Sequence, residues 1–345
     1  MQTSRNGADQ LISVVVPAYN EETVLNDFHQ RCAAVLEKTG LPWEIIYVND
    51  GSTDRTLDTM AELQKSCPGV SIVDLSRNFG KEIALTAGLE YARGDIVIVI
   101  DADLQDPPEL IPELLGKWRD GYDNVYAKRI SRSGESLFKR LTARVFYRII
   151  GGMSRVEIPE NTGDFRLLSR RAVDSVLKLR EQHRFMKGLF SWIGYPAVAV
   201  EYHRDPRAAG KTKWNYWNLM NFAIEGITSF STAPLRLATA VGLGTAALAL
   251  AYASVVFYRT LAFGDPVAGY PSMMIIILFL GAVQLIFIGV IGEYLGRMFN
   301  ETKNRPLYLV NRFSAGESAV ATGTETDPSG TGPSSDQTPP NQPRA

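Results

Sequence analysis

The chain has 345 residues, enough for one large domain with further segments, and its formal net charge is −1. A balance so close to zero excludes a global preference for nucleic acid, so any electrostatic binding must be local. The two cysteines and three scattered histidines offer neither a disulfide framework nor the ligand spacing of a zinc site.

The N-terminal part of the chain alternates between apolar runs and amphipathic stretches. A polar tail, residues 1–10, lacks the apolar core of a signal peptide, which predicts that the chain starts in the cytoplasm. The apolar runs predict buried strands and the stretches between them predict helices. Strands are expected at 11–19, 43–50, 70–76 and 95–101, and helices at 21–39, 56–67 and 81–93. This alternation predicts an α/β fold with a mostly parallel sheet covered on both faces.

Polar residues follow three of the expected strands, in "PAYNEE" (17–22), "VNDGSTD" (48–54) and "DADLQDPPE" (101–109). Ligands of open α/β sheets bind outside the carboxyl ends of the strands. A single acidic residue at a strand end often only caps the next helix, which is the simpler interpretation of Asp54. Three such ends at one edge of the sheet predict a binding site.

Asp101, Asp103 and Asp106 are three mutually repelling carboxylates close together in the sequence. A divalent cation would relieve this repulsion, and carboxylate oxygens suit Mg²⁺ or Mn²⁺. Asp101 and Asp103 point the same way if the strand continues, and Gln105 adds an amide oxygen. The cation is expected to bridge a nucleotide diphosphate. Neither a Walker A motif nor GxGxxG occurs, which disfavours P-loop and Rossmann modes of nucleotide binding.

Two long uncharged runs, 237–258 and 266–292, follow this domain. A bilayer core of about 30 Å needs about 20 apolar residues as helix, so both runs are long enough to span it. We expect two transmembrane helices, at about 236–259 and 270–292 within residues 231–300. The alternative is a pair of core helices in a soluble domain. More basic residues flank the pair of runs than lie in the loop that connects them. This distribution predicts a multi-pass protein of the inner membrane, with the catalytic domain and both termini in the cytoplasm.

Two further stretches are expected to lie at the membrane surface. Leucine, valine and isoleucine repeat every fourth residue within the basic segment 128–148, which predicts an amphipathic helix near 135–150. Aromatic residues cluster in 214–230, as is typical of the headgroup level. An ordinary solvated surface helix is the alternative for the first stretch. Residues 301–313 are expected to be a cytoplasmic juxtamembrane segment, and 314–345 a disordered tail.

Several motifs resemble those of family 2 glycosyltransferases, whose fold is the Rossmann-like GT-A fold. They are "VVVPAYNEE", "YVNDGSTD", "SRNFGKEIALTAGL", "DADLQDPPELIPELLGKW", "NTGDFRLLSR", "HRFMKGLFSWIG", "EGITSFSTAPLR", "IGEYLGRMF" and "KNRPLY". The resemblance covers about residues 11–310, with the catalytic domain at 11–230. It is closer to the polyprenyl-phosphate glycosyltransferases, especially the GtrB-like bactoprenol glucosyltransferases, than to the related dolichol-phosphate mannose synthases.

The resemblance implies a role for particular residues on the donor side. The nucleoside pocket would be lined by Pro17, Tyr19 and Glu21, with Asp50 on the uracil base. Lys81 would lie near the sugar or diphosphate, and Asp101 would hold the ribose or a water on the metal. Asp103 and Gln105 would be the direct ligands of Mg²⁺ or Mn²⁺, so that Asp103 is counted among the catalytic residues.

On the acceptor side, the resemblance places Asp164 beside the reacting sugar as a catalytic residue. Whether Asp164 removes a proton or only orients sugar hydroxyls stays open, because a lipid phosphate is already anionic. The loop "RDPRAAGKTKW" (204–214) departs from the usual family pattern at Lys211 and Thr212. Arg207 and Lys213 in this loop, and Arg129, are the candidates for holding the lipid phosphate or the diphosphate.

The implied reaction is inverting, metal-dependent transfer of a hexose to undecaprenyl or another polyprenyl phosphate, for use in glycosylation of the cell envelope. Glucose from UDP-glucose is the first choice. UDP-GlcNAc, UDP-galactose, GDP-mannose and a formamido-arabinose donor are alternatives. Two further hypotheses are a membrane polysaccharide synthase and a non-enzymatic membrane scaffold. The resemblance also makes a homo-oligomer, such as a tetramer, plausible, and no nucleic acid partner is expected.

Overall fold

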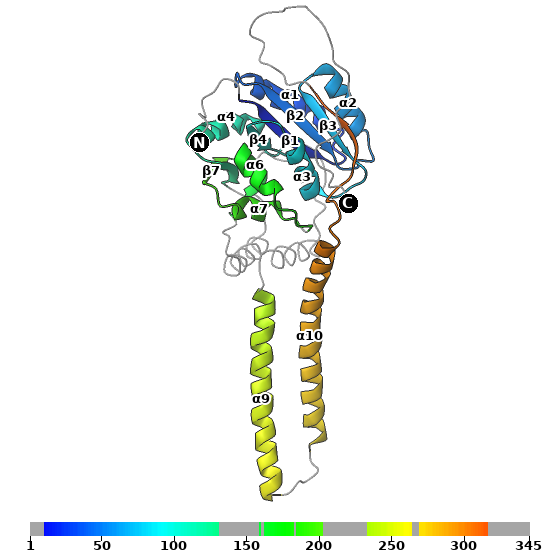
Figure 1. The fold of residues 1–345 in the computed structure, drawn as a ribbon, viewed down its shortest axis with the longest axis vertical. Coiled ribbons are helices and arrows are strands. Elements are labelled where there is room, and N and C mark those ends of the chain that lie inside the picture. The colour runs from blue at the N-terminus through cyan, green and yellow to red at the C-terminus, as the bar shows by residue number, and fades with distance from the viewer. Residues whose placement is uncertain are drawn as a thin grey trace, which may run out of the picture.

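The computed structural model describes residues 10–130, 159, 162–182, 184–202, 233–263 and 269–316. Figure 1 shows an α/β domain from which two long helices lead away side by side. The two predicted interfacial helices, near 135–150 and 214–230, lie outside the described residues, as does most of the predicted tail.

One sheet forms the centre of the α/β domain, in the order β7-β5-β6-β4-β1-β2-β3-β8. Its strands are β1 (Ile12–Ala18), β2 (Trp43–Asn49), β3 (Val70–Leu75), β4 (Ile96–Val99), β5 (Asn124–Arg129), β6 (Thr162–Ser169), β7 (Ala197–Tyr202) and β8 (Val310–Ser314). The pairs among β1 to β4 and the pair β5/β7 are parallel, whereas β6 and β8 pair antiparallel to their neighbours. The predicted mostly parallel sheet and its first four strands are therefore confirmed.

Helices cover both faces of the sheet, as the apolar strands predict. One face packs against α1 (Leu25–Glu37), α2 (Thr56–Ser66) and α4 (Ile111–Arg119), which follows the short 3₁₀ helix η1 (Pro108–Leu110). The other face packs against α3 (Lys81–Tyr91), α6 (Arg170–Leu177) and α7 (Met186–Trp192). Strand β1 contributes buried residues to both layers, with Val14 and Val16 on the first and Val15 on the second. The carboxyl ends of the strands are thereby held in one rigid edge.

The two long helices are α9 (Ala233–Phe263) and α10 (Tyr270–Thr302). At 1.5 Å per residue each is about 45–50 Å long, which exceeds the thickness of a bilayer core. Within the described residues, the segment Phe279–Thr302 meets the length and composition of a membrane span, and Ala238–Tyr252 is a shorter apolar stretch. Large apolar side chains along both helices are exposed, which is typical of a membrane or protein contact rather than of a soluble surface.

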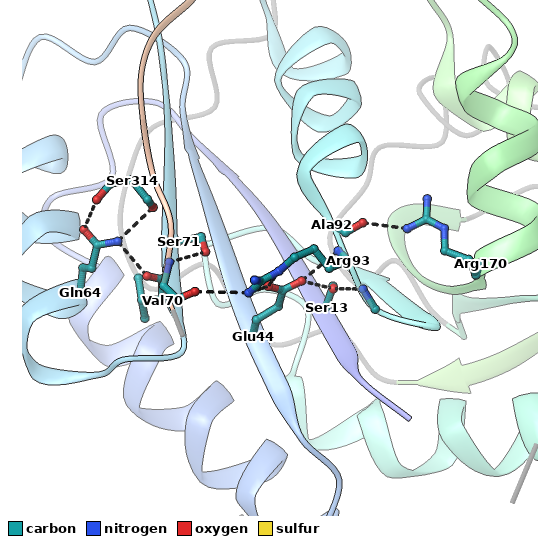
Figure 2. Close-up of polar contacts among 11 residues, drawn as sticks. Ser13, Glu44, Gln64, Val70, Ser71, Ala92, Arg93, Arg170 and Ser314 are labelled. Atoms are coloured by element: carbon teal, nitrogen blue, oxygen red, sulfur yellow. Dashed lines mark hydrogen bonds and ion pairs between the residues drawn. The ribbon is translucent and has the colours of Figure 1, made fainter. Parts of the chain in front are cut away.

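A C-terminal strap, residues 310–316, corrects two predicted boundaries. Its strand β8 pairs antiparallel with β3, so the end of the juxtamembrane segment and the start of the expected tail belong to the sheet. The Phe313 ring lies 4.4 Å from the Tyr91 ring between centroids. Ser314 Oγ donates to Gln64 Oε1 over 2.7 Å (Figure 2). The strand is short and mostly exposed, so its stability comes from a partner distant in sequence, which local composition does not reveal.

Figure 2 shows a second polar cluster, at the amino ends of β1 and β2, on the opposite edge from the predicted site. Glu44 is 1% exposed and accepts hydrogen bonds from Ser13 Oγ at 2.5 Å and from Arg93 Nη2 at 2.6 Å. Arg93 also donates to the carbonyl of Gly316 over 3.3 Å. A buried carboxylate with a cation and hydroxyl partner is a structural feature here, and it joins the strap to the core of the domain.

Candidate active site

The loops after β1 and β2 are joined by hydrogen bonds. The amide of Asn20 donates to Ser52 Oγ at 3.1 Å, and Asn20 Oδ1 accepts from the amide of Thr53 at 2.8 Å. Gly51 has a φ of +64°, and a Cβ there would lie 2.4 Å from the backbone of Arg77, so the turn requires glycine. The predicted ends of β1 and β2 are thus drawn together, and the loop after β3 packs against them.

Residues predicted to line the nucleoside pocket lie at this edge. Pro17 is buried within β1, Tyr19 is exposed just beyond it, and Glu21 is partly exposed in the following loop. The amide of Glu21 donates to Thr56 Oγ1 at 2.8 Å, which anchors the loop to the start of α2. Their contacts with a nucleoside stay a prediction. Asp54 accepts from the amide of Thr56 at 3.0 Å, which agrees with the simpler interpretation of it as a helix cap.

Asp50 has a structural role that the sequence did not indicate. Its carboxylate is 3% exposed and accepts from the amides of Phe79 at 2.7 Å and Gly80 at 3.0 Å. Burial raises the pKa of Asp50, and these two amides oppose that shift. Asp50 therefore holds the loop that places Lys81 at the start of α3. Its predicted contact with uracil is not tested by this arrangement.

Lys81 connects two of the predicted site residues. Its Nζ lies 2.6 Å from Asp101 Oδ2, after β4, and 2.6 Å from Asp164 Oδ2, in β6. The two strands are neighbours and antiparallel, so residues distant in sequence meet above the sheet edge. Asp164 Oδ1 is buried without a hydrogen-bond partner among the described residues. A buried carboxylate oxygen without a donor is costly, and a sugar hydroxyl is a donor of the right kind.

The charges of this group shift one another's protonation. Burial raises the pKa of Asp164, but the nearby cations Lys81 and Lys187 outweigh burial and hold its pKa well below the ordinary value. Burial lowers the pKa of Lys81, but Asp101 and Asp164 outweigh it and raise the pKa. Burial raises the pKa of Asp101, and the charge of Lys81 only partly opposes this. At neutral pH the Lys81–Asp164 pair is therefore charged.

The expectation that Asp101 and Asp103 point the same way was based on a continuing strand, and the structure corrects it. Strand β4 ends at Val99, and residues 102–106 form a turn followed by a bend. Leu104 has a φ of +58°, an unusual conformation for a large side chain that is found at strained, functional turns. In this turn the amide of Gln105 donates to Asp103 Oδ1 at 3.1 Å. Asp103 and Gln105 thus share one turn, whereas Asp101 is directed at Lys81.

Asp106, the third of the crowded carboxylates, has partners of its own, although its charge still helps to raise the pKa of Asp101 after burial, the largest cause. It contacts the Tyr202 hydroxyl, and Arg129 Nη2 lies 3.8 Å from its Oδ1. Two of the three carboxylates are therefore balanced by protein cations, Asp101 by Lys81 and Asp106 by Arg129. This answers part of the predicted repulsion without a metal.

The residues that would hold a divalent cation fit such an ion in their chemistry. Asp103 supplies a carboxylate and Gln105 an amide oxygen, and both are hard ligands. No group of three or more His, Cys, Asp or Glu side chains arranged for a metal occurs in the described part of the chain. Mg²⁺ typically takes only one or two carboxylates and completes its shell with water and phosphate oxygens. The donor set therefore suits an ion that binds together with a diphosphate.

Three charged residues near Asp164 were not predicted. Glu82 follows Lys81 in α3, and its Oε2 accepts from the amide of Met186 at 3.0 Å. Arg166 is buried in β6, stacks on the Phe190 ring at 4.1 Å, and has its pKa lowered to about 10 by burial. Lys187 lies in α7, and burial lowers its pKa against the charge of Asp164. Only the quoted stretch "HRFMKG" pointed to this region in the sequence.

The protonation of Glu82 gives a testable dependence of stability on pH. Burial, followed by the charge of Asp164, raises the pKa of Glu82 to about 7. The folded state then binds a proton that the unfolded state has lost, so this group makes stability fall as pH rises from about 4.5 to about 7. Glu82→Gln keeps an acceptor for the Met186 amide and removes the titration. We expect the Tm of the unchanged protein to fall relative to that of Glu82→Gln between pH 5 and pH 8.

The titration of Asp164 does not interfere with this measurement. The pKa of Asp164 is lowered in the folded protein, so its contribution to stability changes only at pH values below the ordinary pKa of an aspartate. Glu62→Gln, on the exposed side of α2, is the matched control and should follow the unchanged protein. Parallel Tm curves for Glu82→Gln and the unchanged protein would contradict the assignment.

Of the predicted phosphate-binding residues, Arg129 lies in β5, whereas Arg207 and Lys213 lie outside the described residues. Arg129 is mostly buried and joins the site through Asp106. The structure thus brings together Lys81, Asp101, Asp164 and, through Asp106, Arg129. It places Asp103 and Gln105 in the adjoining turn.

Comparison with known proteins shows which families the chain matches. The family described as "Glycosyl transferase family 2" matches residues 13–177, and "GtrB C-terminal hairpin" matches 233–298. A Synechocystis protein called an uncharacterized glycosyltransferase is 55% identical over 87% of this chain and 94% of its own length. The SfII prophage-derived bactoprenol glucosyl transferase of Shigella flexneri is 49% identical over 88% of this chain and 99% of its own length.

A solved structure is also among the proteins to which this chain is similar. Glucosyl-3-phosphoglycerate synthase from Mycobacterium tuberculosis, in complex with Mn²⁺, UDP-glucose and phosphoglyceric acid, is 23% identical, with a TM-score of 0.45. The similarity covers 64% of this chain and 78% of that chain.

Proposed function

This chain belongs to glycosyl transferase family 2, and we propose that it transfers a hexose from a nucleotide sugar to a polyprenyl phosphate at a membrane surface. The names of relatives such as the Shigella flexneri bactoprenol glucosyl transferase support glucose as the sugar and undecaprenyl phosphate as the acceptor. UDP-glucose is accordingly the first donor to test.

One observation carries this proposal. Lys81 bridges Asp101 and Asp164 from two different strand ends, beside the turn that bears Asp103 and Gln105. The Oδ1 atom of Asp164 is also buried, and it has no hydrogen-bond partner among the described residues. Binding of a nucleotide sugar requires a cation for the diphosphate, oxygens for a metal and an acceptor for a sugar hydroxyl.

In the reaction, an oxygen of the lipid phosphate attacks the anomeric carbon of the donor. The new bond from this oxygen to the anomeric carbon forms as the bond to the UDP oxygen breaks, and the electron pair leaves with UDP. A single displacement inverts the configuration, so an α-linked donor gives a β-linked product. The attacking phosphate is already an anion, and no general base is needed. Asp164 then serves to orient the sugar hydroxyls, and it stays charged because Lys81 holds its pKa low.

We assign the divalent cation, Mg²⁺ or Mn²⁺, to Asp103 and Gln105. When bound, such an ion stabilises the negative charge that develops on the departing diphosphate. We assign Asp101, which pairs with Lys81, to the ribose or to a water on the metal, and Lys81 to the diphosphate or sugar. Pro17, Tyr19 and Glu21 form the proposed nucleoside pocket, with Asp50 as the proposed contact of the uracil base.

We further propose that α9 and α10 are two membrane spans. Their match to a C-terminal hairpin and their exposed apolar side chains support this topology. Basic residues flank the pair, which favours a cytoplasmic catalytic domain and cytoplasmic termini. The hairpin holds the domain at the surface where the lipid headgroup lies, which replaces a search in three dimensions by a local one. Arg129, Arg207 and Lys213 are the proposed ligands of the lipid phosphate and the diphosphate.

A transfer assay tests the proposal. Purified full-length protein is mixed with Mg²⁺, undecaprenyl phosphate and a panel of labelled nucleotide sugars, and label is counted in the organic phase. We expect label from UDP-glucose. Label only from another sugar corrects the donor and keeps the mechanism. No label from any sugar, with UDP released only to water or not at all, refutes the acceptor half of the proposal.

A further inference from the structure

Asp106, Tyr202 and Arg129 contact one another beside the donor site, while Asp106 Oδ2 is buried without a hydrogen-bond partner among the described residues. The Tyr202 hydroxyl donates to Asp106 Oδ1. Arg129 Nε donates to the Tyr202 hydroxyl oxygen at 3.2 Å, and Arg129 Nη2 lies 3.8 Å from Asp106 Oδ1. The Asp106 carboxylate is 1% exposed, so it depends on these partners. The guanidinium is thus held by the hydrogen bond from Nε to the Tyr202 hydroxyl and by the charge of Asp106. It does not form a bidentate hydrogen bond with the Asp106 carboxylate.

The positions of these residues follow from the sheet. Arg129 and Tyr202 are the last residues of the parallel strands β5 and β7, and they are partners in the register. Asp106 reaches them from the turn after β4 that also carries Asp103 and Gln105. The contacts therefore connect the turn proposed to hold the metal with the strand end proposed to hold the acceptor.

Gly163 brings the guanidinium close to the reacting centre. A Cβ at this position would lie 3.0 Å from Arg129 Nη2 and 3.4 Å from Asp106 Oδ2. The next residue is Asp164, whose carboxylate contacts Lys81. Arg129 thus packs against the backbone that carries Asp164, so an anion on Arg129 lies near the position proposed for the sugar.

We propose that Asp106 and Tyr202 are positioning residues that hold the guanidinium of Arg129 in place for the phosphate of the lipid acceptor. This inference rests on the proposed function, in which Arg129 binds that phosphate. A planar guanidinium whose orientation is already set loses less freedom when it binds a phosphate, and it directs the attacking oxygen toward the anomeric carbon. Asp106 is by this assignment not a ligand of the metal, although it shares a turn with the residues that are.

Burial and charge support the same assignment. Burial lowers the pKa of Arg129, but the Tyr202 hydroxyl and the charge of Asp106 outweigh it and raise the pKa. The cation therefore remains charged although it is mostly buried. Without Asp106, a buried guanidinium would repel other cations of the site and lose its fixed orientation.

The test separates the KM for the acceptor from the KM for the donor. Tyr202→Phe removes only the hydroxyl, and Asp106→Asn removes only the charge. We expect each to raise the KM for undecaprenyl phosphate by about tenfold or more, the effect of losing one hydrogen bond to a charged group. The KM for UDP-glucose and the Mn²⁺ concentration for half-maximal rate should stay within about twofold of the unchanged protein. Arg129→Ala removes the guanidinium itself and therefore gives the largest expected rise in the KM for undecaprenyl phosphate.

Matched controls are available outside the site. Tyr195→Phe removes a hydroxyl that bonds Ser175 Oγ at 3.0 Å, and Asp123→Asn removes a buried carboxylate that pairs with Arg171. Both should leave the acceptor KM unchanged. If Asp106→Asn fails to fold, Tyr202→Phe decides the question alone.

The outcomes are distinguishable. A raised KM for UDP-glucose or an altered Mn²⁺ dependence, with the acceptor KM unchanged, would overturn the inference and place Asp106 on the metal side. An unchanged acceptor KM in Tyr202→Phe, with a raised one in Arg129→Ala, overturns the inference alone. An unchanged acceptor KM in Arg129→Ala removes the role of Arg129 and the inference with it. Absence of transfer by the unchanged protein refutes the proposed function itself.

Discussion

Replacement of Asp103 by asparagine is expected to lower the rate of glycosyl transfer by about three orders of magnitude and to leave the fold intact. A bound divalent cation contributes several kcal/mol of stabilisation to a departing diphosphate, and each 1.36 kcal/mol corresponds to about tenfold in rate. Asparagine keeps the oxygen that accepts the Gln105 amide, so the turn is preserved while the charge on the metal ligand is lost.

Two measurements check this prediction. Initial rates with saturating UDP-glucose and undecaprenyl phosphate give the loss of activity, and calorimetry of UDP with Mn²⁺ reports the metal directly. Asp58→Asn, an exposed change in α2, is the control and should behave as the unchanged protein in both. Near-normal transfer by Asp103→Asn would reject Asp103 as a metal ligand, and so would lost transfer with unaltered binding of UDP and Mn²⁺.

The elements of the first half of the fold were predictable from local pattern. Strand β2 (Trp43–Asn49) was expected at 43–50 and α3 (Lys81–Tyr91) at 81–93, because continuous apolar runs and amphipathic stretches determine them without distant partners. The shared edge of the strand ends followed from the α/β topology. The positions of Lys81 and Asp164 beside Asp101 did not, because only the family resemblance had pointed to these two residues.

Contacts across the chain account for what was missed. The turn after β4 breaks the strand geometry on which the direction of Asp101 depended, and a positive φ at Leu104 has no signal in composition. Tyr202 pairs with Asp106 over 96 positions, and Met186 with Glu82 over 104. Such pairs depend on which strands are neighbours in the sheet, and one sequence does not supply that order. The same reason explains why Asp106 was grouped with the other carboxylates.

Truncation of the chain after Leu309 is expected to lower the Tm of the catalytic domain by about 10 °C, whereas truncation after Gly316 should leave it unchanged. The first variant removes the C-terminal strap and uncovers the edge of β3, and the second keeps every residue of the strap. Unpaired strand edges also favour aggregation, so the shorter chain should be less soluble in detergent.

The contacts of the strap set the size of this effect. Asn311 donates to Asp74 Oδ2 at 2.7 Å, Ser314 to Gln64 at 2.7 Å and the Gly316 amide to Ser71 Oγ at 2.9 Å, and Phe313 packs on Tyr91. Hydrogen bonds of about 1 kcal/mol each and an aromatic pair of about 1 kcal/mol amount to roughly 4 kcal/mol. For a domain of this size that lowers the Tm by about 8–16 °C.

Thermal unfolding of the two truncated proteins in the same detergent, followed by tryptophan fluorescence, gives the comparison. Both variants retain α9, α10 and the hydrogen bond from the Gln182 amide to Glu301 at 2.8 Å, so the contact of α10 with the loop before α7 is common to the pair. A difference in Tm is then attributable to residues 310–316. Equal Tm values for the two truncations would mean that β8 adds no stability to the sheet. The strap would then only cover the edge of β3, and the contact of α10 with Gln182 would remain as a link between α10 and the domain.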